Sequence, residues 1–542
     1  DMETMELSAE VLPKPMIGRP LLTASIFAAA ILLIVMWAVL RPGMPQLAVA
    51  HEAQSMSMVW LAPFVLLLAA IAVMPFINKH WWEKYYPAVS LGLAALAAGG
   101  YCLVLARPDK WLHGLMDYVS FVILLGSLFV VSGGISIHVG RRATPLANCL
   151  MLLSGAILAN VLGTTGAAML LIRPYLRMNR GHLKPYHIVF FIFIVANVGG
   201  ALTPIGDPPL FLGYLSGVPF WWTFTKLQAA WAMAVGILLV VFFIFDWRDH
   251  RGQEREDHGA EGGPALRILG KHNFLLIGLI ILAVFRPGLV DALRPLNRGV
   301  SLLALVDLIT CREILMIAAA VISWRLTPGH VHKHNEFTFG PIKEVAILFF
   351  GIFATMVPAI DYLQSNARHL PLNTPGNFYF ASGALSSVLD NAPTYKTFLE
   401  LRLAGVENGH LSAAKLALAD MAKMRSLDLK GDHHEQVRAC VGALVYHYPE
   451  QVLAGTMGEE RVRLGFLLGT PALSLFIVAI SVGSVFWGAC TYIGNGPNLM
   501  VKSIADAAGC KTPSFGGYIV RYVLPILIPT YLLIWLIFFA FA

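Results

Sequence analysis

Two similar polar phrases interrupt apolar stretches of this 542-residue chain. The first, TPIGDPPL, covers residues 203–210, and the second, TYIGNGPNL, covers residues 491–499. The glycines and prolines in each phrase disfavour a continuous helix. The first phrase has a carboxylate, Asp207, where the second has an amide, Asn495. Both phrases therefore predict a helix break that brings polar side chains and unpaired backbone groups into an apolar setting.

Two further apolar segments, 144–172 and 378–400, have polar centres. These centres read ANVLGTTGA at 159–167 and LDNAPT at 389–394. Each segment is typical of a re-entrant helical hairpin, which enters and leaves the membrane on the same side. Arginines flank the first segment at both ends. Since lysine and arginine accumulate in cytoplasmic loops, a hairpin keeps both flanks on one side, whereas a full crossing would separate them.

The composition places these breaks in a membrane protein. The chain is 57% hydrophobic and only 13% charged, with a mean hydropathy of +0.68, whereas soluble domains carry about 25% charged residues. No GxxxxGK[ST] loop is present, which argues against ATP-driven pumping, and nothing in the sequence indicates an enzyme, a bound cofactor or a nucleic-acid partner. We predict an all-α polytopic fold with about 11 transmembrane helices of roughly 20 residues. The apolar runs lie at 21–40, 58–77, 87–106, 119–139, 186–218, 225–246, 273–287, 299–324, 341–360, 467–508 and 516–541.

The helices and hairpins fall into two predicted repeats. Residues 58–246 contain the hairpin 144–172, and residues 273–542 contain the hairpin 378–400. An odd number of crossings in each repeat turns the second copy upside down, which is the inverted-repeat plan of secondary transporters. The remaining parts are an N-terminal segment with one transmembrane helix or a signal-like sequence, a cytoplasmic linker and a polar insertion outside the membrane, at 1–57, 247–272 and 401–460.

The four breaks predict one central site. Unpaired backbone groups are tolerated at membrane depth only where they are buried in protein or line a watery cavity. Two acids, Asp207 and Asp390, belong to the breaks, and an ionisable group at this depth is a functional hypothesis by default. Burial disfavours an ionised carboxylate and a bound cation favours it, so such a group can exchange a proton for sodium. The neutral groups predicted to bind a cation, with sodium at the same residues, or a substrate are Asn160, Thr164, Thr165, Asn197, Thr203, Asn391, Thr394, Thr491, Asn495 and Asn498.

Structural explanations compete with these roles. Asp207 precedes two prolines and Asp390 precedes a predicted helix, so either residue can be a helix N-cap. Lys396 can neutralise Asp390 as an internal ion pair. The asparagines can satisfy freed backbone groups instead of binding an ion. Asp307 is a weaker candidate for a proton relay, and the histidines at 330–334 are expected to be solvated.

Three motifs resemble a known family: ANVGGALTPIGDPPLFLGYL, SSVLDNAPTYKTFL and TYIGNGPNLMVKSIAD. They are similar to the ion-transporter superfamily, in particular its NhaD-like sodium:proton antiporter branch, which overlaps sequences assigned to citrate transport. The resemblance covers residues 58–541 and implies a homodimer that works by an elevator motion. In the dicarboxylate members, Ser-Asn-Thr signatures at the hairpin tips hold sodium and the substrate carboxylate.

The matching positions in this chain are Asn160 with Thr164 and Asn391 with Thr394. The serine position holds Ala159 in the first hairpin and Asp390 in the second. This departure disfavours dicarboxylate binding and favours cations.

We therefore expect an integral membrane protein of the bacterial inner membrane, with a cytoplasmic N-terminus, that works as a secondary active transporter. The favoured hypothesis is a sodium (or lithium)/proton antiporter that operates by alternating access. The alternative is a sodium- or proton-coupled transporter of citrate, a dicarboxylate or another anion. A membrane scaffold or a channel is a weaker explanation, because neither needs polar breaks in both halves.

Overall fold

The computed structural model describes residues 57–104, 108–139, 143–251, 266–284, 312–335, 337–366, 372–422 and 434–541. Within these ranges almost all regular structure is helical, and eight helices are long and apolar enough to cross a membrane. The protein is an all-α polytopic membrane protein, as predicted. The predicted helix at 21–40 and Asp307 lie outside the described residues.

The elements follow one another along the chain with few long connections. The first half contains η1 Met58–Leu61, α2 Ala62–Ile77, α3 Lys79–Gly99, η2 Gly100–Val104, α4 Pro108–Gly133, β1 Ser136–Val139, α5 Pro145–Met178, α6 Pro185–Ile194, η3 Val198–Gly200, α7 Pro208–Leu215 and α8 Phe220–Arg251. Next come β2 Leu266–Leu269, α9 His272–Val284, α12 Arg312–Leu326, α13 Gly329–His334, α14 Gly340–Asn366, α15 Pro375–Val388, α16 Asn391–Ala404, α17 Asn408–Ala422, α18 His434–His447, α19 Pro449–Ala454 and α20 Glu459–Gly469. The chain ends with α21 Pro471–Trp487, η6 Gly488–Cys490, α22 Gly496–Ala507, α23 Phe515–Tyr518, η7 Ile519–Leu527 and α24 Ile528–Phe538.

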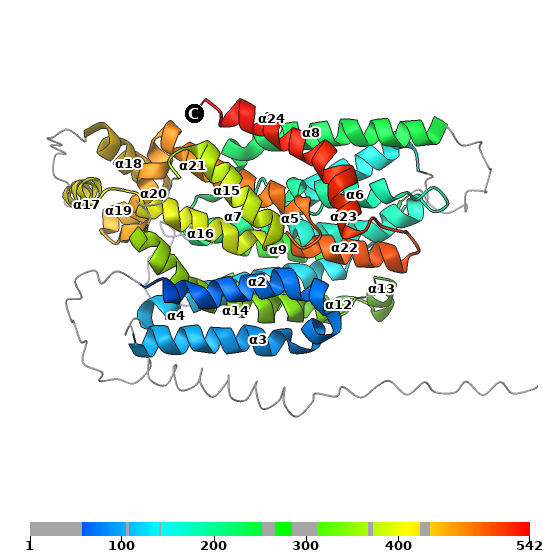
Figure 1. The fold of residues 1–542 in the computed structure, drawn as a ribbon, viewed down its shortest axis with the longest axis horizontal. Coiled ribbons are helices and arrows are strands. Elements are labelled where there is room, and N and C mark those ends of the chain that lie inside the picture. Colours follow the sequence, from blue (N-terminus) through cyan, green and yellow to red (C-terminus); the bar gives the residue numbers. More distant parts are fainter. Residues whose placement is uncertain are drawn as a thin grey trace, which may run out of the picture.

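The helices form two groups that pack against each other. Helices α2, α3, α4, α12 and α14 contact one another and lie together along one side of the molecule (Figure 1). Helices α5, α6, α7, α15, α16, α21 and α22 make up the second group, with α8 and α24 along its far side (Figure 1). Helix α14 contacts α16 and α4 contacts both α5 and α7, so the first group covers the second.

Helix α5 is a hairpin, although its length and composition alone resemble a single crossing. Its continuity is broken at Gly163, whose φ of 76° and ψ of 156° are not helical. Near its two ends, the side chains of Asn148 and Asn179 donate hydrogen bonds to each other at 2.9 Å. A straight helix would separate these residues by about 46 Å. The two arms therefore run back alongside each other, as predicted for 144–172.

Helices α15 and α16 form the second hairpin. They are separated by Leu389 and Asp390, which are not helical. The rings of Phe378 on α15 and Phe398 on α16 lie 6.1 Å apart, edge to face, whereas a continuous helix would separate them by about 30 Å. The hairpin predicted at 378–400 is present, and its arms extend over 375–404.

Both predicted crossing helices are unwound at the polar phrases. Between α6 and α7 the chain makes only the short η3, and Asp207 is extended before α7 begins. Between α21 and α22 it makes only η6, and Asn495 is likewise extended before α22 begins. The breaks were predicted because proline and glycine cannot sustain the helical hydrogen bonds there. The division of the chain into two inverted repeats stays a prediction.

Two features differ from the sequence analysis. The segment 401–460, predicted as a polar loop or surface helix, is built from several helices with a hydrophobic core of their own, which includes Leu411, Leu418, Val441 and Phe466. Its apolar residues recur at helical spacing, so mixed charge did not prevent a packed core. Strands β1 and β2 pair antiparallel, with Ser136 opposite Leu269 and Val139 opposite Leu266, and the sequence did not predict this ribbon.

Gly163 is the position in the first hairpin most sensitive to substitution. Its combination of positive φ and extended ψ is accessible almost exclusively to glycine. We expect Gly163→Ala to destabilise the hairpin by about 1–3 kcal/mol, seen as a lower melting temperature of the purified protein. Gly92→Ala is the matched control, because it replaces a helical glycine that has open space around it. An equal melting temperature for the two variants would contradict the hairpin geometry.

Candidate functional site

Asp207 lies where the two hairpin tips meet. Its side chain is 1% exposed. Thr164, the first residue after the break in α5, donates its hydroxyl to Asp207 Oδ1 at 2.7 Å. Asn391, the first residue of α16, donates its amide to Asp207 Oδ2 at 2.5 Å. Asn495 Nδ2 lies 3.3 Å from Asp207 Oδ1. One carboxylate is therefore bound by both hairpins and by the second unwound segment.

A line of buried amides extends from this carboxylate. Asn495 Nδ2 also donates to the carbonyl of Ala196 at 3.1 Å and lies 3.2 Å from Asn197 Oδ1. Asn197 Nδ2 in turn donates to Asn498 Oδ1 at 2.7 Å and to the carbonyl of Ile192 at 2.8 Å. These contacts join the two unwound segments, which lie about 300 residues apart in the chain.

Asn160 serves the backbone of the first unwound segment. Its Nδ2 donates to the carbonyls of Ala156 at 2.9 Å and Gly199 at 2.7 Å, and its Oδ1 accepts from the amide of Leu202 at 2.9 Å. Thr203 donates its hydroxyl to the carbonyl of Asn160 at 2.6 Å. Both ends of the Asn160 amide are thus occupied by backbone groups that the break would otherwise leave unpaired.

The second unwound segment repeats this arrangement with different residues. Thr491 donates its hydroxyl to the carbonyl of Ser387 at 2.6 Å and accepts from the amide of Gly494 at 3.0 Å. Asn498 Nδ2 donates to the carbonyls of Gly488 and Thr491, both at 2.9 Å. Thr203 and Thr491 therefore bind equivalent carbonyls, each three residues before the break of its hairpin.

Paired glycines let the backbone fold back on itself at both unwound segments. A Cβ on Gly494 would lie 2.6 Å from the carbonyl oxygen of Gly488, and one on Gly206 would overlap the carbonyl oxygen of Gly200. The amide of Thr164 donates to the carbonyl of Gly206 at 2.8 Å. This close approach brings the backbone beside Asp207 against the first hairpin tip.

The two acids differ in their local roles. Asp207 occupies the N-cap position of α7, but its side chain makes no capping hydrogen bond, so the capping explanation for its carboxylate is wrong. Asp390 is half-buried, and its Oδ1 accepts from the amide of Ala392 at 3.1 Å, which makes it a true N-cap of α16. Thr394 donates to the carbonyl of Asp390 at 3.1 Å, within its own helix. Thr165 is half-buried, and its side chain makes no hydrogen bond with the described residues.

Two expectations about pairings change. Lys396 binds Glu400 and Ser216, so its assignment as the partner of Asp390 is wrong. Asn160 and Asn391, which the resemblance treated as matching positions, lie on different sides of their breaks. Asn160 precedes Gly163, whereas Asn391 follows Asp390, and its counterpart by contact with Asp207 is Thr164.

The charge around Asp207 comes from neutral donors. Among the described residues, no lysine, arginine or histidine forms a hydrogen bond or ion pair with this carboxylate. Four helical segments begin beside it: the second arm of α5 at Thr164, α7 at Pro208, α16 at Asn391 and α22 at Gly496. Helix N-termini carry partial positive charge, which stabilises the anion.

Asn391 has an acceptor available at the site. Its Oδ1 is buried and has no hydrogen-bond partner in the structure. No group of three or more histidine, cysteine, aspartate or glutamate side chains in the described ranges could hold a metal ion. A cation at this centre would therefore be bound by the Asp207 carboxylate together with neutral oxygens, a donor set that suits a hard ion such as sodium.

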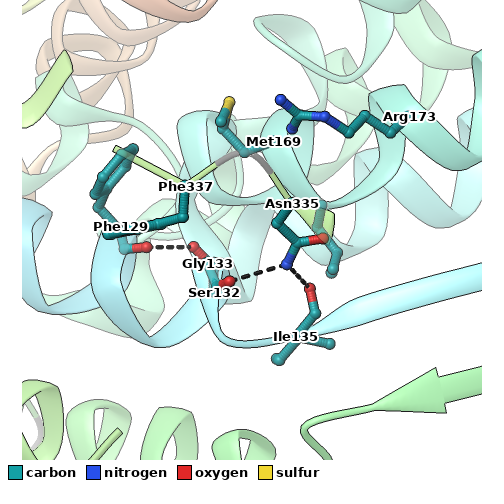
Figure 2. Close-up of a pocket in the computed structure, with 9 residues that line it drawn as sticks. Phe129, Ser132, Gly133, Ile135, Met169, Arg173, Asn335 and Phe337 are labelled. Carbon is teal, nitrogen blue, oxygen red and sulfur yellow. Dashed lines mark hydrogen bonds between the residues drawn. The ribbon is translucent and has the colours of Figure 1, made fainter. Parts of the chain in front are cut away.

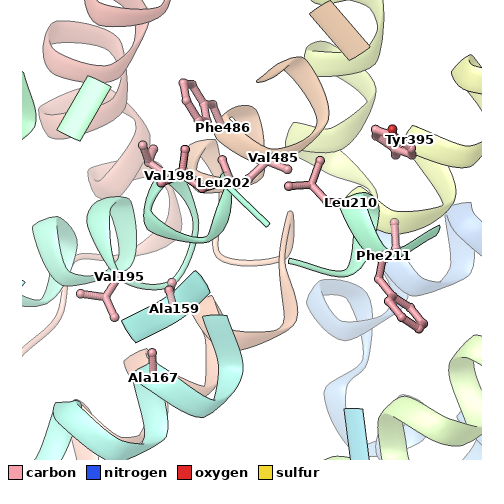
Figure 3. Packing of buried hydrophobic residues seen from close by; sticks show 14 of the residues in the cluster. Ala159, Ala167, Val195, Val198, Leu202, Leu210, Phe211, Tyr395, Val485 and Phe486 are labelled. Atoms are coloured by element: carbon pink, nitrogen blue, oxygen red, sulfur yellow. The ribbon is translucent and has the colours of Figure 1, made fainter. Parts of the chain in front are cut away.

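An apolar shell encloses the polar centre. Figure 3 shows buried side chains from α5, the first unwound segment, α7, α16 and α21 packed around it, including Ala159, Val198, Leu210, Tyr395 and Phe486. Each of these side chains is at most 1% exposed. Such a shell keeps the local dielectric constant low, which strengthens the interactions of Asp207 with its donors.

Two cavities lie away from Asp207. The smaller, of about 10 Å³, is lined by residues that include Phe129, Arg173 and Asn335 (Figure 2), and has room for at most one water molecule. The larger is an open depression of about 650 Å³ between the ends of α5 and α22. Its lining includes three cations, Arg177, Arg180 and Lys511, and no acid. We had treated the arginines only as topology signals and did not predict this depression.

Comparison with known proteins identifies the family. A family model described as "Putative citrate transport" matches residues 53–539, most of the chain. A comparison with curated proteins found no match. The matched range contains both hairpins, both unwound segments and Asp207. The chain therefore belongs to the citrate-transport family of membrane transporters.

Proposed function

We propose that this protein is a sodium (or lithium)/proton antiporter in which Asp207 binds either a cation or a proton. The observation that carries the proposal is the position of this carboxylate, which is buried, contacted by both hairpin tips and held by neutral donors only. A charge at this depth without a basic partner must be neutralised by something that arrives from solution.

The donors suggest how the two ligands compete. In the structure, the hydroxyl of Thr164 and the amides of Asn391 and Asn495 donate to Asp207, as they would to an ionised carboxylate. A cation needs oxygen lone pairs instead. The Thr164 hydroxyl retains free lone pairs, and rotation of the Asn391 amide would turn its unpaired Oδ1 toward the ion. A proton on Asp207 removes the charge that holds the cation, so the two ligands exclude each other.

Asp390 is proposed as the second titratable group. It directly precedes Asn391 and is half-buried, whereas Asp207 is fully buried. A cation that approaches Asp207 past this tip would meet Asp390 first. The conformational change that exposes the site alternately is proposed to follow from the inverted-repeat plan, in which the two halves exchange conformations.

A carboxylate transporter is the second candidate. The basic depression lined by Arg177, Arg180 and Lys511 would attract an anion such as citrate, and the family description supports this candidate. The four helix N-termini at the centre also favour negative charge. Against it, Asp207 already occupies that position and would repel a carboxylate unless a cation or proton were bound first.

Proteoliposomes with an internal pH dye distinguish the two candidates. We expect a sodium or lithium gradient, with the membrane potential clamped by potassium and valinomycin, to drive protons in the opposite direction without added carboxylate. Raising the proton concentration should increase the half-saturating sodium concentration without changing the maximal rate, because both ligands bind Asp207. Sodium- or proton-dependent uptake of labelled citrate, with no proton movement on sodium addition alone, would favour the second candidate and reject the first.

A further inference from the structure

A buried charge pair lies on α16, separate from Asp207. Lys396 Nζ is 2.7 Å from Glu400 Oε1, and the two side chains are only 14% and 7% exposed. The same ammonium group donates to the hydroxyl of Ser216 at 2.6 Å. Burying two charges is costly unless they are paired and hydrogen-bonded, so this pair needs an explanation beyond stability.

The lysine joins two helices that already share the central site. Asp207 directly precedes α7 and Ser216 directly follows it, while Asn391 begins α16 and Lys396 lies further along the same helix. Asn391 is bonded to Asp207 at 2.5 Å and Lys396 to Ser216 at 2.6 Å. Helices α7 and α16, one from each half of the chain, are therefore fastened to each other at both ends of α7.

The middle of this helix pair is packed too closely for slippage. A Cβ on Gly213 of α7 would overlap the hydroxyl of Tyr395 on α16. Tyr395 is completely buried, so its ring has no free space to move into. The backbones of the two helices can approach this closely only because position 213 is glycine.

The charges also match the ends of α7. Ser216 donates its hydroxyl to the carbonyl of Leu212 at 2.9 Å, so the ammonium group of Lys396 reaches the last turn of the helix through this hydroxyl. A cation is favourable at a helix C-terminus and an anion at its N-terminus. Lys396 and Asp207 occupy these two ends, with the anion held against α16 by Asn391.

We propose that Lys396 is a positioning residue that locks α16 onto α7 and thereby sets where the Asn391 amide meets Asp207. With the lock in place, the two helices move as one body, and the contact between Asn391 and Asp207 keeps its geometry while the site changes its exposure. The consequence for sodium affinity rests on the proposed function, whereas the lock itself does not.

Hydrogen–deuterium exchange of the full-length protein in detergent tests the lock without any substrate. The variants are Ser216→Ala, which removes the link to α7 and keeps the charge pair, and Lys396→Met/Glu400→Gln, which removes both charges together. We expect amide exchange in residues 210–216 and 391–396 to accelerate by about tenfold, which is the effect of losing one hydrogen bond to a charged group. Exchange in α3 should be unchanged.

Lys502→Met is the matched control. Lys502 also pairs with a carboxylate four residues along a helix, Asp506 at 2.5 Å, but this pair is partly exposed to solvent. We expect no change in exchange in this control. Unchanged exchange at α7 and α16 in both test variants, or an equal acceleration over the whole protein, would overturn the proposal.

Transport measurements separate this inference from the proposed function. In the sodium-driven assay, Ser216→Ala should raise the half-saturating sodium concentration by about tenfold and change the maximal rate less than twofold, and Ser216→Thr, which restores a hydroxyl, should rescue it. Local acceleration of exchange in a protein that shows no sodium-driven proton movement would uphold the lock and reject the antiporter. Normal sodium affinity together with unchanged exchange would reject the lock alone.

Discussion

Replacing Asp207 by asparagine abolishes sodium-driven proton movement, down to the background of empty liposomes. The amide cannot titrate and cannot neutralise a cation, so neither ligand of the exchange has a binding group. The fold should survive, because asparagine has nearly the same shape. Its Nδ2 would face the Asn391 amide, which can rotate to present the buried Oδ1 that has no partner in the wild-type protein.

The measurement compares Asp207→Asn with Asp506→Asn in the same liposomes. Asp506 is a partly exposed acid that pairs with Lys502 near the end of α22, so its loss should leave the exchange intact. The elution profile and melting temperature of both variants should match the wild-type protein. Sodium-driven proton movement at the wild-type rate in well-folded Asp207→Asn would remove this residue from the mechanism.

The same assay examines Asp390 with a pair of substitutions. Asparagine at this position removes the charge but can still accept from the amide of Ala392, so the cap on α16 is kept. Alanine removes both the charge and the cap. If the charge takes part in exchange, Asp390→Asn should lose activity as Asp390→Ala does. Activity retained in the asparagine variant would leave Asp390 with only its capping role.

Replacing Asp246 by alanine should lower the stability of the protein by about 3 kcal/mol. Asp246, near the end of α8, is 4% exposed. Its carboxylate accepts from Asn148 Nδ2 at 2.9 Å and Tyr186 Oη at 2.8 Å, and His187 Nε2 lies 3.2 Å away. Asn148 is also bonded to Asn179, so this carboxylate ties the open end of the first hairpin to α6 and α8. Its loss leaves several buried donors without an acceptor.

Asp249→Ala is the matched control for Asp246→Ala, three residues further along the same helix. Asp249 is 30% exposed and lies 3.6 Å from Lys184, so its removal should cost less than about 1 kcal/mol. Thermal unfolding of both variants in one detergent measures the difference. Similar melting temperatures would show that the buried cluster does not hold the base of the hairpin.

Much of the fold was accessible from local patterns. Apolar runs of about 20 residues, the charge bias of the loops and the glycines and prolines of the two phrases predicted the membrane class, both hairpins and both breaks. Each of these signals arises within a short window of chain. Gly163 marks the limit of such signals: the hairpin was predicted around it, but only its φ and ψ identify it as the turning point.

The helices of the 401–460 segment and the ribbon of β1 and β2 were missed for different reasons. Mixed charge concealed the helical spacing of residues such as Leu411 and Leu418, which pack into a small separate core. A four-residue strand has almost no local signal of its own, and β1 is paired with β2 from across the chain. Short elements that depend on distant partners are not predictable from one stretch of sequence.

Composition and motif spacing alone established a polytopic transporter with acids at broken helices, because hydrophobic length and helix-breaking residues act locally. They did not establish which acid would be central. Asp207 and Asp390 had equal standing until folding brought Asn391, 184 residues away in the chain, against the first of them and left the second as a cap. Lys396 likewise found Ser216, 180 residues away, rather than the nearby Asp390. Such partners are set by how helices from the two halves pack, since side-chain contacts over this distance follow from the arrangement of the backbone and not from neighbouring residues.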